Sequence, residues 1–123
     1  MTDPHALRAR MRTDLTAAMK ARDKDAVAAL RTGLAAVDNA EAVAAPQPSG
    51  PPATSEHVAG TTAGLGTAEV ARRVLSLDDV HAIVAAQVAE WAAEADRYES
   101  LGRPDDAARL RREAEVLRAY LPG

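Results

Sequence analysis

Apolar residues recur along the chain in four stripes with helical spacing. The first stripe steps by four residues and the other three mix steps of three and four, as on an α-helix with one buried face. In chain order the stripes are Leu7, Met11, Leu15 and Met19; Val27, Leu30, Leu34 and Val37; Val80, Val84, Val88, Trp91, Ala95 and Tyr98; and Ala107, Leu110, Ala114, Leu117 and Leu121. The pattern predicts four amphipathic helices.

The first two stripes are predicted to form a helical hairpin. Asp3 followed by Pro4 is typical of an N-cap and the first helical position. The charged run 22–25, Arg-Asp-Lys-Asp, separates the two stripes and offers Asp as a cap for the second helix. Two stripes joined by so short a turn are expected to pack against each other.

The last two stripes predict a second hairpin. Ser76 is suited to cap a long helix, with Asp79 three residues later forming an imperfect capping box. Gly102 favours the end of that helix and Pro104 the start of the next. Residues 67–75 are compatible with an extended segment and with a short helix, and the pattern does not decide between them.

Residues 45–66 differ from the rest of the chain because they are rich in proline and glycine. Such a segment neither completes a helical hydrogen-bond ladder nor buries apolar surface, so we predict a flexible linker. The expected architecture is all-α. It is a single helical domain over residues 1–123, in which a first hairpin (1–44) and a second hairpin (67–123) pack as one small bundle.

Composition limits the size of the core. Hydrophobic residues make up 47% of the 123 residues, but 30 of them are alanines and only 28 are larger. So few large side chains support one small domain or two thin helical layers, not a deep pocket. Alanine favours helices and Phe is absent, which disfavours a sheet-based enzyme.

The residues show no recognisable catalytic or metal site. There is no Cys, and none of His5, His57 and His81 has a His-x-x-x-His or Glu-x-x-His partner. No serine lies in a Gly-x-Ser-x-Gly context, and no glycine-rich phosphate loop follows a strand. We therefore predict no catalytic residues, no metal, no cofactor and no small-molecule substrate.

The chain also shows no membrane or secretory signal. It has no apolar run of about 18 residues. Its first residues do not combine a basic stretch with an apolar one, as a secretory signal does. We expect a cytoplasmic protein with no membrane partner.

Carboxylates alternate with arginines along the predicted helix faces. Pairs three or four residues apart stabilise a helix by about 0.2–0.5 kcal/mol each and are usually solvated. The clearest are Glu94 with Arg97, Arg109 with Glu113, and Arg112 with Glu115. Solvated ion pairs are therefore favoured over catalytic carboxylates.

Basic residues alone do not predict nucleic-acid binding. The net charge of −3 and the pI near 5.6 disfavour a broad basic stripe. Small basic groups are nevertheless present on both hairpins: Arg8 and Arg12, Arg22 and Lys24, and Arg72 and Arg73. Trp91 and the two tyrosines, Tyr98 and Tyr120, lie on the apolar stripes, which favours core packing over base stacking.

Both hairpins carry residues that resemble a known family. In the first they are Asp14, Ala18-Met19-Lys20, Asp23-Lys24, Leu30-Arg31, Leu34, Asn39 and Glu41. In the second they are Tyr98, Gly102-Arg103, Asp105, Glu113, Leu117 and Tyr120-Leu121-Pro122. Over roughly residues 7–42 and 67–122 the chain resembles the GatB/YqeY-like family, which is similar to the helical tail of the B subunit of glutamyl-tRNA(Gln)/aspartyl-tRNA(Asn) amidotransferase.

The resemblance implies a tRNA-associated, amidotransferase-like protein, in a short form without the family's usual C-terminal helical domain. The family label is carbon–nitrogen ligase activity with glutamine as amido-N-donor. That chemistry belongs to the amidase and kinase-like parts of the amidotransferase, for which this sequence has no counterpart. We therefore expect a non-catalytic module that binds tRNA, a tRNA-handling enzyme or another protein.

Four residues are the candidate binding positions because charge and family resemblance coincide there: Lys20, Lys24, Arg31 and Arg103. Each also has a purely structural explanation, such as a helix-dipole contact for Lys20 or an internal ion pair for Arg31 and Arg103.

The alternative function is a helical protein–protein interaction or dimerisation module with neither enzymatic activity nor RNA binding. It would use a spare alanine face that includes Ala85, Ala89 and Ala92.

Overall fold

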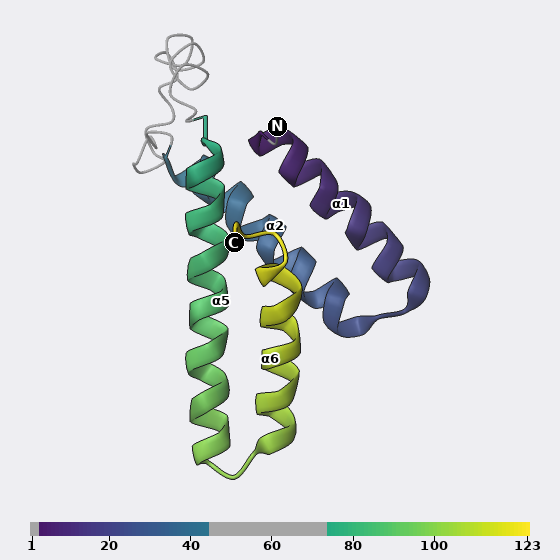
Figure 1. The fold of residues 1–123 in the computed structure, drawn as a ribbon, viewed down its shortest axis with the longest axis vertical. Helices are drawn as coiled ribbons and strands as arrows, with labels where there is room; N and C mark the ends of the chain where they lie inside the picture. The colour runs from purple at the N-terminus through teal and green to yellow at the C-terminus, as the bar shows by residue number, and fades with distance from the viewer. Residues whose placement is uncertain (1–2, 45–73) are drawn as a thin grey trace, which may run out of the picture.

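The structure is a computed structural model that describes residues 3–44 and 74–123. In these two ranges the chain forms four helices and no strand: α1 (Pro4–Ala21), α2 (Lys24–Ala44), α5 (Leu77–Ser100) and α6 (Pro104–Arg118). The helices form two hairpins, as Figure 1 shows, so the predicted all-α bundle is confirmed. The predicted linker 45–66 and most of the segment 67–75 lie outside the described residues.

Side-chain caps fix the first residues of α1 and α5. Asp3 Oδ1 accepts a hydrogen bond from the Ala6 N–H at 2.7 Å, as its predicted role as N-cap requires. Ser76 Oγ accepts from the Asp79 N–H at 3.0 Å, and Asp79 Oδ2 accepts from the Ser76 N–H at 2.9 Å. The capping box is therefore complete, although Asp stands where Glu or Gln is usual.

Both hairpin turns depend on a residue in the left-handed region. Arg22 ends α1 with φ at 59°, and Asp23 Oδ1 then accepts from the Ala26 N–H at 3.2 Å at the start of α2. Gly102 follows α5 with φ at 77°, a conformation that glycine adopts without strain. The turns lie where the sequence predicts them.

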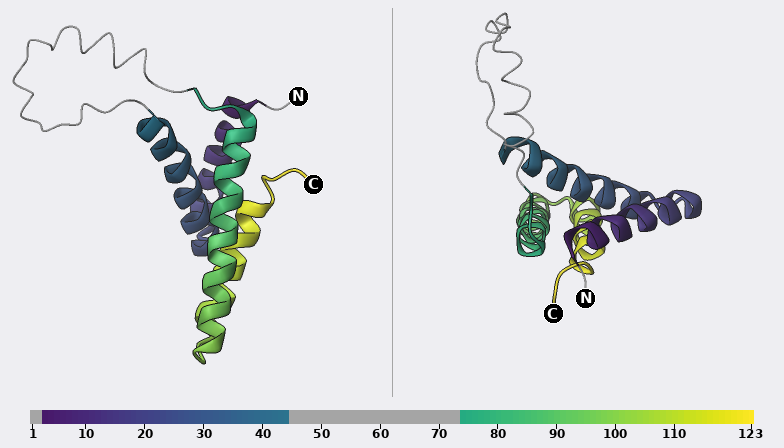
Figure 2. Two further views of the ribbon diagram at one scale, coloured as in Figure 1. Left: turned by 90° about the vertical axis from the view of Figure 1, so that its left-hand side faces the viewer. Right: turned by 90° about the horizontal axis from the view of Figure 1, so that it is seen from above.

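Helix α2 joins the two hairpins by packing across both α5 and α6. Figure 2 shows this crossing from above, with the α1–α2 turn extending beyond α6 and away from α5. At Gly33 a Cβ atom would lie 2.9 Å from Leu117 Cδ2 and 3.1 Å from Met11 Cε. Glycine thus allows α1, α2 and α6 to meet closely at this point.

The core confirms most of the predicted stripes, and a few positions differ. Every predicted member of α5 from Val80 to Ala95 is buried, and so are four of the five predicted members around α6. Met19 is 49% exposed, however, and Ala18 is buried in its place. The α1–α2 turn extends past the second hairpin (Figure 2), so neither α5 nor α6 covers this end of α1.

Tyr120 is buried, which confirms the core packing predicted for it, and its side chain links the end of α6 to α1. Its hydroxyl donates a hydrogen bond to the Asp14 carboxylate. The Arg10 guanidinium lies over its ring, 4.7 Å from the centroid. Burial and the hydrogen bond to Asp14 raise the pKa of Tyr120 above its usual value.

None of the helices in the described ranges combines the length and the apolar character needed to cross a bilayer.

Truncating a core leucine is expected to destabilise the protein strongly. Leu30 and Leu117 are almost completely buried, so Leu30→Ala or Leu117→Ala should lower the free energy of unfolding by about 2–5 kcal/mol. Leu101→Ala is the matched control because Leu101 is 65% exposed. Urea unfolding followed by circular dichroism measures the effect. If the free energy of unfolding falls no more than in Leu101→Ala, the assignment of these leucines to the core is wrong.

Tyr120 predicts a loss of stability at alkaline pH. A tyrosine ionises near pH 10 when unfolded. Because the pKa of Tyr120 is higher in the folded protein, its contribution to the free energy of unfolding is complete below about pH 10. This contribution is lost as the pH rises toward the folded pKa, by up to about 1.4 kcal/mol per pH unit. Tyr120→Phe should show a smaller loss of melting temperature than wild type between about pH 9 and 11. Identical pH profiles for wild type and Tyr120→Phe would contradict this role.

Candidate functional site

The basic residues of the described ranges fall into a paired and an unpaired group. Arginines with a carboxylate partner are Arg8, Arg10, Arg97, Arg103, Arg109, Arg111, Arg112 and Arg118. The other basic residues of these ranges have no ion-pair partner, and they are Arg12, Lys20, Arg22, Lys24 and Arg31. We call these five residues the unpaired cations.

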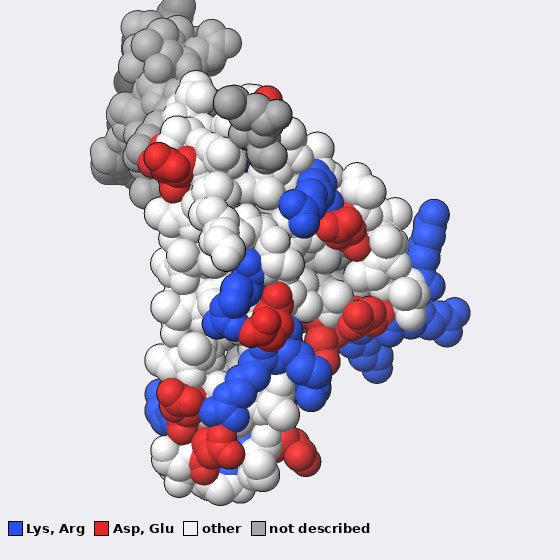
Figure 3. Space-filling model, in the orientation of Figure 1, with Lys and Arg blue, Asp and Glu red and all other residues white. Residues whose placement is uncertain are grey.

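All the unpaired cations belong to the first hairpin. Lys20 is in the last turn of α1, Arg22 is its C-cap, and Lys24 is the first residue of α2. Figure 3 shows Lys and Arg side chains gathered at the end of the molecule where α1 meets α2. The unpaired cations therefore give this end a local excess of positive charge.

The carboxylates near this end have other partners. Asp23 caps α2, and Asp14 accepts the hydroxyl hydrogen bond of Tyr120. Asp25 Oδ2 accepts a hydrogen bond from Arg112 Nε of α6 at 2.7 Å. Asp23 thus contacts the start of α2, and Asp14 and Asp25 contact Tyr120 and Arg112 of the second hairpin.

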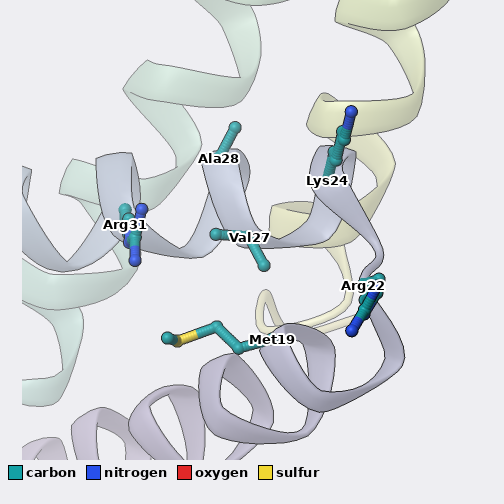
Figure 4. Close-up of a pocket in the computed structure, with 6 residues that line it drawn as sticks. All are labelled: Met19, Arg22, Lys24, Val27, Ala28 and Arg31. Carbon is teal, nitrogen blue, oxygen red and sulfur yellow. The ribbon is translucent and has the colours of Figure 1, made fainter.

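An open groove of about 420 Å³ lies among these cations. Its lining residues come from the end of α1, the turn and the start of α2: Met19, Arg22, Lys24, Val27, Ala28 and Arg31. In Figure 4 the Met19 side chain extends beneath Val27, with Arg22 toward one end and Arg31 toward the other. Lys24 and Ala28 point away from α1. The groove therefore combines an apolar floor with two guanidinium groups.

The structure brings three of the four predicted binding residues to one end of the molecule. Lys24 and Arg31 line the groove, and Lys20 lies two residues before Arg22. Lys20 also lies where a cation favours the helix dipole. No internal ion pair holds Arg31 in the described part of the chain.

Arg103 lies elsewhere, at the turn between α5 and α6 (Figure 1). Its Nη2 is 2.8 Å from Asp106 Oδ2, and its guanidinium lies 5.3 Å from the centroid of the Tyr98 ring. Arg103 therefore forms the internal ion pair that its structural explanation predicts, and it lies apart from Lys20, Lys24 and Arg31.

Among the described members of the basic groups noted in the sequence, Arg8 has carboxylate partners. Arg8, whose side chain is 12% exposed, contacts Glu41 at 3.1 Å and Asp38 at 3.7 Å and so links α1 to α2.

The predicted pairing of Arg112 with Glu115 is wrong. Arg112 pairs with Asp25, as described above, because it faces α2, and Glu115 pairs with Arg118.

The other predicted ion pairs form. Glu94 contacts Arg97, and Glu113 lies 3.9 Å from Arg109. Burial raises the pKa of Glu113 and nearby Asp25 adds to the rise, whereas Arg109 and Arg112 oppose it. Glu113 is thus a largely buried carboxylate with cationic neighbours on its own helix.

The predicted alanine face of α5 is partly exposed. Ala85 and Ala89 lie on the surface, and Ala92 is half-buried beside α6. No partner copy is part of the structure, so dimerisation through this face stays a prediction.

The groove itself was not predicted, although the sequence contains a signal for it. Arg12, Lys24 and Arg31 have no Asp or Glu three or four positions away in either direction. Arg97 and Arg109 do have such neighbours and form ion pairs. Counting carboxylates at helical spacing would therefore have separated these three cations from the paired arginines other than Arg8, which also has no such neighbour and pairs with carboxylates of α2. The exposure of Met19 depends on packing and has no comparable signal.

Within residues 3–44 and 74–123, no group of His, Cys, Asp and Glu side chains is arranged to hold a metal ion.

Comparison of the chain with protein-family models, curated proteins and solved structures found no match. The GatB/YqeY resemblance therefore stays a prediction that rests on the residues quoted in the sequence analysis.

Proposed function

We propose that the protein is a non-catalytic RNA-binding module that holds tRNA against the end of the molecule where α1 meets α2. The observation that carries this proposal is the concentration of the unpaired cations on the first hairpin, in a chain whose net charge is −3. The arginines of α5 and α6 in the described ranges all have carboxylate partners.

Unpaired cations bind a polyanion more readily than paired ones. A paired arginine must exchange its carboxylate for a phosphate, whereas an unpaired one exchanges only water and counterions. Release of counterions from the nucleic acid then favours binding and makes the affinity depend on salt. The guanidinium groups of Arg22 and Arg31 can each donate two hydrogen bonds to one phosphate, and Lys24 contributes a point charge.

The choice of tRNA as the RNA comes from the family resemblance. Lys20, Lys24 and Arg31 belong both to the resembling residues and to the unpaired cations. Among the described residues, the groove lining contains no carboxylate, histidine or hydroxyl side chain that could act as a base or nucleophile. We therefore assign any glutamine-dependent ligase chemistry to a partner enzyme, and we assign the module to the cytoplasm, where tRNA is charged.

Removing cations from the α1–α2 end should weaken tRNA binding and its salt dependence. The test variant is Arg22→Gln/Lys24→Gln/Arg31→Gln. If each cation contacts one phosphate, the slope of log K against log salt should fall by about 2–3, and the affinity at about 50 mM salt should fall at least tenfold. Filter binding of tRNA between about 50 and 200 mM salt measures both quantities.

The matched control removes the same charge from paired residues, as Arg97→Gln/Arg103→Gln/Arg118→Gln. It should retain most of the affinity and the slope. Equal losses in the two triple variants would show that only net charge matters. Absence of tRNA binding at low salt would reject the proposed function.

A further inference from the structure

We propose that the groove between Met19 and Val27 binds the base of one unpaired nucleotide, while Arg22 and Arg31 hold the phosphates on either side of it. The inference rests on the proposed RNA binding and adds which part of an RNA this surface recognises. It predicts a preference for unpaired nucleotides over a duplex.

Met19 is the first observation behind this inference. Large hydrophobic side chains are exposed at three positions in the described ranges: Met19, Val74 and Leu101. Of these, Met19 lines the groove with three of the unpaired cations. An exposed apolar side chain among cations suits a ligand that carries an apolar surface next to negative charge.

A nucleotide within a strand has this combination, because each base has an apolar face and a phosphate on either side. The methionine thioether is polarizable and packs favourably against aromatic rings. Guanidinium groups also stack on unpaired bases. In Figure 4 the Met19 side chain beneath Val27 forms the floor, and Arg22 and Arg31 lie toward its two ends. None of the described residues that line the groove is an Asp or Glu, whose charge would repel the phosphates.

A duplex would leave the apolar floor unused. In a double helix the faces of the bases are stacked on one another, and a protein meets base edges, 2′-hydroxyls and phosphates. Unpaired loops and ends can instead present a splayed base, whose face would cover Met19 and Val27. The exposed floor therefore favours a single-stranded segment.

An acidic peptide also combines apolar and anionic groups, but it fits the distribution of charge less well. The unpaired cations extend from the groove to Lys20 and Arg12 along α1. A strand with one negative charge per nucleotide can contact cations both inside and outside the groove. A peptide side chain in the groove leaves the outer cations without a regular partner.

The residues of the groove provide a matched pair of variants. Met19→Ala removes apolar surface without changing charge, and Met19 is exposed enough for the fold to persist. Lys24→Gln removes one charge from a side chain that points away from Met19. Leu101→Ala is the control for losing an exposed hydrophobic side chain far from the groove.

The experiment measures binding of the full chain to labelled probes by fluorescence anisotropy over a salt series. The probes are a single-stranded RNA octamer, an abasic octamer with the same number of phosphates, a blunt RNA duplex and poly-glutamate. Wild type should bind the RNA octamer about tenfold more tightly than the abasic octamer. Met19→Ala should weaken binding of the RNA octamer about fivefold, with the salt slope and the abasic affinity unchanged. Lys24→Gln should weaken both octamers by the same factor and lower the slope by about 0.7.

Several outcomes would overturn the inference. If the RNA and abasic octamers bind equally and Met19→Ala matches Leu101→Ala, the surface recognises phosphates alone, and only the proposed RNA binding survives. Tighter binding of the duplex than of the RNA octamer would also show that the surface recognises phosphates alone. Met19-dependent binding that is tighter for poly-glutamate than for the RNA octamer would assign the groove to an acidic protein segment. If no RNA probe and no tRNA binds at low salt, the proposed function fails as well.

Discussion

The close contact of α2 with α1 and α6 at Gly33 is the constraint on which the rest of the structure depends. A Cβ atom at this position would lie 2.9 Å from Leu117 Cδ2 and 3.1 Å from Met11 Cε, so the glycine leaves room for the ends of these two side chains between the helices. The core has few large side chains because alanine dominates its composition. Thin helices must then approach closely to exclude water, and the glycine costs helix propensity of about 1 kcal/mol to permit this approach.

The same packing determines which surfaces remain uncovered. Because α2 crosses α5 and α6, the α1–α2 turn extends past the second hairpin, and Met19 loses the cover that Leu7 and Met11 have. In the second hairpin, charged side chains form ion pairs within and between α5 and α6. Arg112 of α6 also pairs with Asp25 of the first hairpin. The cations at the α1–α2 end are left without partners as a consequence.

The sequence predicted the helices and their caps correctly, but it did not predict every contact and exposed side chain that results from packing one helix against another. Periodicity and caps depend on neighbours along one helix, so Val80 to Ala95 and the Ser76 cap were predicted correctly. The exposure of Met19 and the hydrogen bond from Tyr120 to Asp14 depend on where a different helix lies, which no local pattern records. Family resemblance grouped Arg103 with Lys24 and Arg31, but its carboxylate three positions later, Asp106, was the better indicator of its contacts.

The negative net charge does not oppose an anion-binding site at the α1–α2 end. Charges separated by more than about 8–10 Å are largely screened at physiological ionic strength. The acidic excess lies mainly in the second hairpin, where many carboxylates already contact arginines. A phosphate near Arg22 and Arg31 would therefore experience mainly the local field of the unpaired cations. For the proposed RNA binding, the local distribution of unpaired charge therefore matters more than the isoelectric point of the whole chain.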